Sequence, residues 1–232
     1  MREKIIKMLQ QVNIPSQFSE DTFDDYVEAL KALDSGLEWS WDGGVSKFVL
    51  LFANYDKVIK IPYLGKYDYN AYEKAIAQDV GADHTLEEFF YEFTGPENYD
   101  NIERGWDYCE LETMFYEIAE TKGLAQYFAK EELCGWIKGH PIYLQTRVTP
   151  LESVCSRTTG EREAATEKRC QELHIHCLDT QWVSDFFEEY GEEEYLRLCA
   201  FLTEYDITDL HVGNLGYLNN KPILLDYSSY MN

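Results

Sequence analysis

The chain has 232 residues, 45% of them hydrophobic and 15% aromatic, so it can bury a core and is not composed like a disordered segment. Its 43 acidic and 20 basic residues give a formal charge of −23. This charge disfavours nucleic acid and anionic membrane surfaces as partners and is compatible with a basic protein partner. The charged N-terminus lacks the apolar region of a secretory leader, and no stretch is long enough to span a membrane, so we expect a cytoplasmic protein.

The first part of the chain predicts two helices. Apolar residues recur at helical spacing in residues 1–12 and again in residues 19–33. We interpret residues 1–36 as a helical cap on the domain that follows.

Three antiparallel strands are expected next, within residues 37–62. β-prone runs alternate there with turn signals, the first of which is Gly43-Gly44. In the third run Lys60 stands between two isoleucines, so its side chain should point to the sheet face opposite theirs.

A single helix dominates the middle of the chain. Residues 64–104 are rich in Tyr, Glu and Asp, and we interpret them as an insertion. Residues 106–122 then carry a buried apolar stripe, which predicts a helix. Glu110, Glu112 and Glu117 lie on this helix, and any of them could pair with a lysine of the sheet.

Two further strands are predicted near Leu133–Ile137 and Pro141–Val148. With the three earlier strands they would complete a five-stranded antiparallel sheet in an α+β fold. Gln145 and Arg147 lie at the end of the last strand, which Pro150 terminates.

The most specific motif lies near the C-terminus. A predicted helix over residues 192–205 leads to Asp209, which Asn214 follows by five residues. A predicted hairpin then returns the chain to Asp226, twelve residues beyond Asn214. Carboxylate and amide oxygens ligate Mg²⁺, and a further carboxylate can orient a hydroxyl group, so this set points to phosphoryl transfer.

In this order and spacing the residues resemble the protein-kinase-like family, in particular its small kinases of the RIO type. The segment Asp209–Asn214 is similar to the catalytic loop H-R-D-L-x-x-x-N, and Asp226 to the aspartate of D-F-G. The resemblance implies a two-lobe fold. Residues 37–148 would form an N-lobe with a five-stranded antiparallel sheet and one helix. Residues 149–232 would form a reduced, mostly helical C-lobe that ends in a hairpin.

The resemblance also implies the roles of the C-terminal residues. Asp209 would be the catalytic residue that positions the acceptor hydroxyl. Asn214 and Asp226 would hold Mg²⁺ against the phosphates of ATP.

The remaining nucleotide contacts come from the same resemblance. Lys60 would bind the phosphates and be held by Glu112, which the family's order of Glu, apolar residue, Ala and Gly in this helix selects among the three glutamates. Gly43-Gly44 would cover the phosphates. Backbone groups near Gln145 and Arg147 would bind the adenine.

Two departures from the family leave two classes of function open. Thr208 replaces the arginine that reads a phosphorylated activation loop, and only six residues follow Asp226. The first is an ATP-dependent phosphotransferase whose substrate is unknown. The second is a non-catalytic, kinase-like acidic protein, either a pseudokinase or a DNA mimic, that captures a basic partner.

Overall fold

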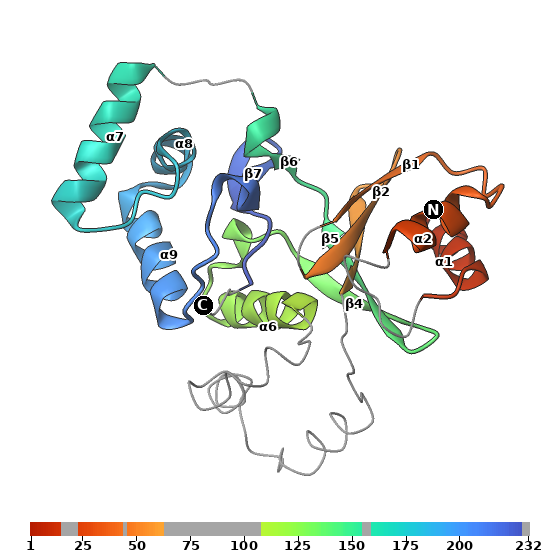
Figure 1. The fold of residues 1–232 in the computed structure, drawn as a ribbon. Helices are drawn as coiled ribbons and strands as arrows, with labels where there is room; N and C mark the ends of the chain where they lie inside the picture. Colours follow the sequence, from red (N-terminus) through yellow and green to blue (C-terminus); the bar gives the residue numbers. More distant parts are fainter. Residues whose placement is uncertain (15–22, 44–45, 63–107, 155–158, 229–232) are drawn as a thin grey trace, which may run out of the picture. The chain divides into compact units, whose positions relative to one another are not determined.

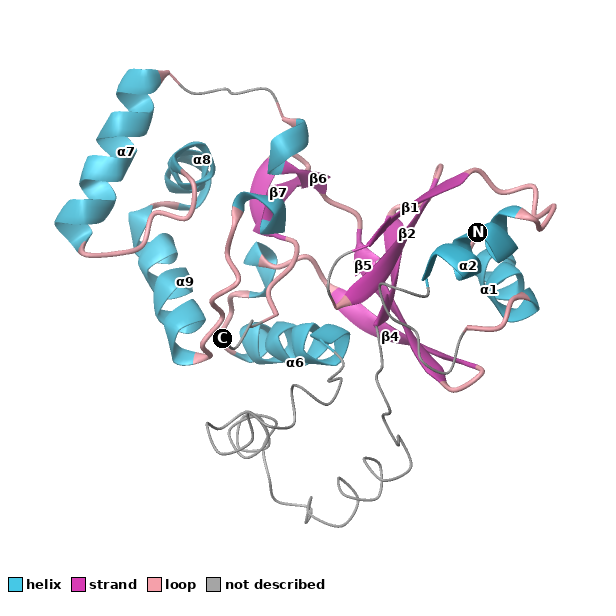
Figure 2. Ribbon diagram, viewed as in Figure 1, coloured by secondary structure: helices cyan, strands magenta, loops and turns pink. Residues whose placement is uncertain are grey.

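The computed structural model describes residues 1–14, 23–43, 46–62, 108–154 and 159–228. Within these residues the protein is α+β, with six α-helices and a five-stranded antiparallel sheet (Figures 1 and 2). The predicted insertion at residues 64–104 lies outside the described residues. None of the described helices is long and apolar enough to cross a membrane.

The chain divides into two compact units, described separately here. Unit 1 comprises Met1–Met114 and Glu131–Gln145, and unit 2 comprises Phe115–Lys130 and Thr146–Asn232. The division passes through helix α6 (Tyr108–Thr121).

Unit 1 is built on the five-stranded sheet, whose strand order is β1-β2-β3-β5-β4. This confirms the predicted five-stranded antiparallel sheet. Two helices, α1 and α2, precede it in the chain, as expected (Figure 1). The elements are α1 (Arg2–Gln11), α2 (Phe23–Lys31), β1 (Trp39–Gly43), β2 (Lys47–Phe52), β3 (Lys57–Pro62), β4 (Glu131–Ile137) and β5 (His140–Thr146).

The two faces of this sheet have opposite character because side chains alternate along each strand. One face packs against α1 and α2 and forms the apolar core of the unit. In β3, Ile59 and Ile61 point into that core, so Lys60 points to the other face, as predicted. The core contains Ile5, Met8, Leu9, Tyr26, Val27 and Leu30 from the helices and Phe48, Leu50, Phe52, Ile59, Ile61, Ile142 and Leu144 from the strands.

Unit 2 contains the second half of α6, three further α-helices and a small sheet of order β6-β7-β8. The further helices are α7 (Gly160–Leu173), α8 (Thr180–Tyr190) and α9 (Glu192–Glu204), and its strands are β6 (Thr149–Pro150), β7 (Leu215–Leu218) and β8 (Lys221–Leu224). Helix α9 and the β7–β8 hairpin were expected from the sequence, whereas α7 and α8 were not.

Side-chain caps stabilise the N-termini of α7 and α8, and a buried tryptophan attaches α8 to the small sheet. Thr159 and Asp179 cap their N-termini by accepting hydrogen bonds from the backbone N–H three residues ahead. From α8, the fully buried Trp182 donates a hydrogen bond of 3.1 Å to the carbonyl oxygen of Gly216 in β7. This bond joins the helix to the hairpin that carries the C-terminal motif.

Gly216 provides a test of packing in unit 2. A Cβ atom at this position would lie 2.6 Å from the carbonyl oxygen of Thr149 and 2.6 Å from Cγ1 of Val148. We expect Gly216→Ala to lower the free energy of unfolding by about 1–3 kcal/mol, measured by urea denaturation. The reason is that β7 must move away from Val148 and Thr149 to admit the methyl group. The control is Gly160→Ala, where no atom lies within 4 Å of the new Cβ. Equal stability of the two variants would contradict this packing.

Candidate functional site

Unit 1 contains a buried ion pair between Lys60 and Glu112. The Nζ atom of Lys60 lies 2.5 Å from Oε2 of Glu112 and 2.9 Å from Oε2 of Glu131. Lys60 is 4% exposed and Glu112 is fully buried. The pair expected from the sequence is therefore present, with Glu112 as the partner; Glu117 is exposed and Glu110 half-buried on the same helix.

Two further side chains bind Glu112, and the sequence analysis had not predicted either interaction. The Nζ atom of Lys47, in β2, donates a hydrogen bond to Oε1 of Glu112. The side-chain amide of Gln145, in β5, donates to Oε2 at 3.2 Å. Glu112 thus accepts hydrogen bonds from two lysines and one amide.

The register of the sheet brings these residues together. Val49 pairs with Lys60 across β2 and β3, and Lys47 lies two residues before Val49, so both lysines share one face. Glu131 in β4 stands directly opposite Gln145 in β5. The four polar side chains consequently form a patch on the sheet face opposite α1 and α2, and Glu112 of α6 binds this patch.

Glu131 is the under-satisfied member of this patch. Its side chain is fully buried, and within the described residues neither carboxylate oxygen makes a hydrogen bond, although Oε2 lies within ion-pair distance of Lys60. With Lys47, Lys60 and Glu112 it gives a formally neutral group of two cations and two anions. Glu131 thus has the ammonium group of Lys60 as its charge partner, whereas Glu112 accepts three hydrogen bonds.

Unit 2 contains the predicted Asp209–Asn214 loop. The side-chain Nδ2 of Asn214 donates a hydrogen bond of 2.6 Å to the backbone oxygen of Asp209, and the backbone N–H of Asn214 donates to the oxygen of His211 at 2.9 Å. These bonds close the loop on itself. Because Nδ2 is the donor, Oδ1 is the atom of Asn214 that can ligate a cation.

The hairpin after this loop brings Asp226 back beside Asn214, as expected. Its turn is Asn219-Asn220, with φ of 54° and 67°, the left-handed pair that a two-residue type I′ turn requires. Leu225 donates its backbone N–H to the oxygen of Asn214 at 3.0 Å, so Asp226 follows directly after this contact. An amide oxygen and a carboxylate at the same end of a hairpin fit the oxygen ligands that Mg²⁺ prefers.

Hydrogen bonds of the next two residues hold the segment that carries Asp226. The next residue, Tyr227, is fully buried and donates its hydroxyl hydrogen to the backbone oxygen of Ala129 at 2.9 Å. The hydroxyl of Ser228 donates to Oδ1 of Asp226 at 3.2 Å. Tyr227 and Ser228 thus anchor the segment that carries Asp226.

The other residues predicted to bind the nucleotide are two glycines, Gly43 and Gly44, and two residues near the end of β5, Gln145 and Arg147. Gly43 ends β1, and its backbone N–H donates to Oδ1 of Asp42 at 2.8 Å. Gly44 lies outside the described residues. Gln145 belongs to unit 1, where its side chain binds Glu112, whereas Arg147 belongs to unit 2 and is exposed just after β5.

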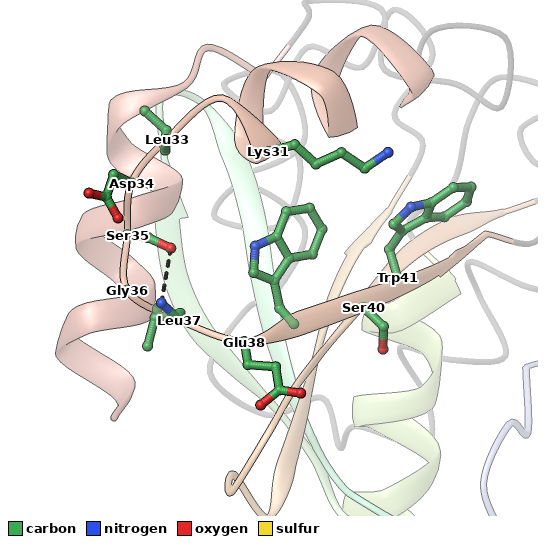
Figure 3. A pocket seen from close by; sticks show the side chains of 10 residues that line it. Lys31, Leu33, Asp34, Ser35, Gly36, Leu37, Glu38, Ser40 and Trp41 are labelled. Carbon is green, nitrogen blue, oxygen red and sulfur yellow. Dashed lines mark hydrogen bonds between the residues drawn. The ribbon is translucent and has the colours of Figure 1, made fainter.

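Two of the pockets lined by described residues bear on the predicted site residues. One, of about 600 Å³, is formed by the turn between α2 and β1 and includes Lys31 and Trp41 (Figure 3). No predicted site residue lines it. The other, of about 860 Å³, lies in unit 2 and is lined in part by Thr208 and Leu210, the two neighbours of Asp209.

Two thiols of unit 2, Cys177 and Cys199, are poor nucleophiles. Burial raises the pKa of Cys199 to about 11 and that of Cys177 to about 12. At pH 8 we expect iodoacetamide to alkylate Cys199 roughly 100-fold more slowly than free cysteine, because the thiolate is the reacting form. Peptide mass spectrometry over time measures this rate. A rate close to that of free cysteine would contradict the burial of this thiol.

No group of three His, Cys, Asp or Glu side chains that could hold a metal ion occurs among the described residues. A metal at Asn214 and Asp226 would therefore have to take its other ligands from phosphate or water, as Mg²⁺ commonly does.

No family model matches this chain, and no curated protein matches its sequence.

Proposed function

We propose that this protein is an ATP-dependent phosphotransferase of the protein-kinase-like superfamily. The observation that carries the proposal is the buried ion pair between Lys60 and Glu112. In kinases a strand lysine, held by a glutamate of a helix, contacts the nucleotide phosphates. Lys60 is in the third strand of a five-stranded antiparallel sheet, and Glu112 is in the helix that precedes the last two strands, which is the order that the family has.

The residues of unit 2 support the same reaction. Mg²⁺, when bound, neutralises charge on the phosphate oxygens, and Asn214 and Asp226 are the residues that would hold it. Asp209 would orient the acceptor hydroxyl and accept its proton. The hydrogen bond from Asn214 to the backbone of Asp209 couples the metal ligand to the catalytic residue.

The high negative charge favours one alternative, an acidic kinase-like protein that captures a basic partner without catalysis. The two functions differ in their need for Lys60. Capture by an acidic surface does not require a lysine buried in a sheet, whereas ATP binding does.

A charge-balanced double variant tests the proposal. The wild-type protein serves as the reference, and the double variant Lys60→Met/Glu131→Gln leaves Lys47 paired with Glu112, so neither form buries an unbalanced charge. We expect the double variant to bind ATP at least tenfold more weakly than the reference in calorimetric titrations with Mg²⁺, because it lacks a charge-assisted bond to phosphate. Equal affinities of the two forms would contradict the role of Lys60, and a lack of ATP binding by both forms would favour the acidic-protein alternative.

A further inference from the structure

We propose that Lys47 is a second phosphate-binding lysine, so that a pair of lysines, rather than Lys60 alone, holds the phosphate chain of the nucleotide. This inference rests on the proposed function and extends it to a residue that the motif comparison does not assign. Three observations carry it: the shared partner of the two lysines, their burial, and the position of Lys47 in the β1–β2 hairpin.

The first observation is that Lys47 and Lys60 each form an ion pair with the carboxylate of Glu112. Lys47 binds one carboxylate oxygen, Oε1, and Lys60 binds the other, Oε2. Both side chains leave the same face of the sheet from neighbouring strands. Their ammonium groups are therefore fixed on either side of one carboxylate, and a phosphate that reaches Lys60 at this carboxylate also comes close to Lys47.

Burial is the second observation. Lys47 is 5% exposed, almost as buried as Lys60 at 4%. Bringing an ammonium group out of water costs free energy, and one lysine would be enough to neutralise Glu112. A second buried lysine requires a second anion, which is Glu131 when no ligand is present. A polyphosphate carries several negative charges and can replace Glu131 as the partner of this pair.

The third observation is the place of Lys47 in the chain. Gly43 pairs with Phe48 across β1 and β2, so Lys47 lies at the start of β2, next to the turn of this hairpin. The sequence Gly43-Gly44 lacks the three-glycine pattern with which kinases cover the phosphates. A lysine from the same hairpin supplies positive charge where the backbone cover is incomplete.

The test compares ligands that differ in their phosphates. The double variant Lys47→Met/Glu131→Gln keeps the buried charges balanced and leaves Lys60 paired with Glu112. The wild type is the reference, and Lys7→Met, at an exposed position on α1, is the matched control. Titrations use Mg-ATP and adenosine. We expect the double variant to weaken Mg-ATP binding by roughly tenfold or more and to leave adenosine binding within about twofold, while Lys7→Met changes neither.

A labelling experiment on the wild-type protein does not depend on the folding of a variant. An acyl phosphate of ATP transfers its acyl group to a nearby lysine, forming an amide as the acyl–phosphate bond breaks and ATP leaves. We expect mass spectrometry to find this group on both Lys47 and Lys60, and excess ATP to suppress the labelling of both. Any label on Lys7 should be insensitive to ATP.

The outcomes separate this inference from the proposed function. If Lys60 alone is labelled, or if the Lys47→Met/Glu131→Gln variant binds Mg-ATP as tightly as the wild type, the inference is wrong and the proposed function stands. Equal losses of Mg-ATP and adenosine binding would make the role of Lys47 structural and would also overturn the inference. If neither the wild type nor any variant binds or is labelled, both proposals fail.

Discussion

Glu112→Gln is expected to lower the free energy of unfolding by about 3–5 kcal/mol. Glu112 is fully buried and accepts hydrogen bonds from Lys47, Lys60 and Gln145. A neutral amide would leave two buried lysines with only Glu131 as a counter-charge. The amide would also place donor hydrogens against other donors. Chemical denaturation followed by circular dichroism measures the loss.

The control for this prediction is Glu117→Gln, one and a half turns further along the same helix and exposed to solvent. This substitution should change the free energy of unfolding by no more than about 0.5 kcal/mol. If Glu112→Gln were as mild, the ion-pair cluster would not be a buried structural unit.

Asp226→Asn is expected to abolish Mg²⁺-dependent ATP binding, because it removes the charged ligand from the proposed metal site. Asp209→Asn should leave that binding within about threefold and lower turnover by roughly 100-fold or more, since the carboxylate acts on the acceptor hydroxyl. Calorimetry measures binding, and the release of phosphate from ATP or autophosphorylation measures turnover.

Glu193→Gln, an exposed position on α9, is the matched control and should alter neither property. Equal effects of the Asp209 and Asp226 substitutions on ATP binding would contradict the separate roles of these two residues. A protein that only captures a basic partner would be insensitive to both substitutions.

Much of the sheet and of the C-terminal loop could be predicted from local patterns. Alternating apolar residues between Gly and Asn turns indicated the strands, and the same alternation indicated that Lys60 points away from the core. The Asn219-Asn220 turn specified the hairpin because both residues tolerate a positive φ. The choice of Glu112 over its two neighbours depended on the resemblance, because helical periodicity alone did not distinguish them.

Lys47 and Glu131 were not predicted, although one signal was present. Lys47 precedes Phe48 in a strand whose phenylalanines point into the core, so alternation places it on the same face as Lys60. Glu131 depends on the pairing of β4 with β5, which sequence spacing does not specify. Contacts between strands far apart in the chain therefore limited the prediction of this site.

Helices α7 and α8 were missed for different reasons. Only Thr166 and Cys170 are buried in α7, so the helix has almost no apolar stripe by which it could be recognised. In α8, Asp179 followed by Trp182, Val183 and Phe186 is a capped amphipathic pattern that predicts a helix, and this signal was available.

The most direct test of the central claim is a thermal-shift titration of the wild-type protein with ATP, with and without Mg²⁺. A ligand at 100 times its dissociation constant stabilises the folded state by about 2.7 kcal/mol, which for a chain of this size raises Tm by roughly 5–10 °C. The account predicts a rise in Tm that grows with ATP concentration and is larger when Mg²⁺ is present. An unchanged Tm at millimolar Mg-ATP would contradict the assignment of this protein as an ATP-dependent phosphotransferase.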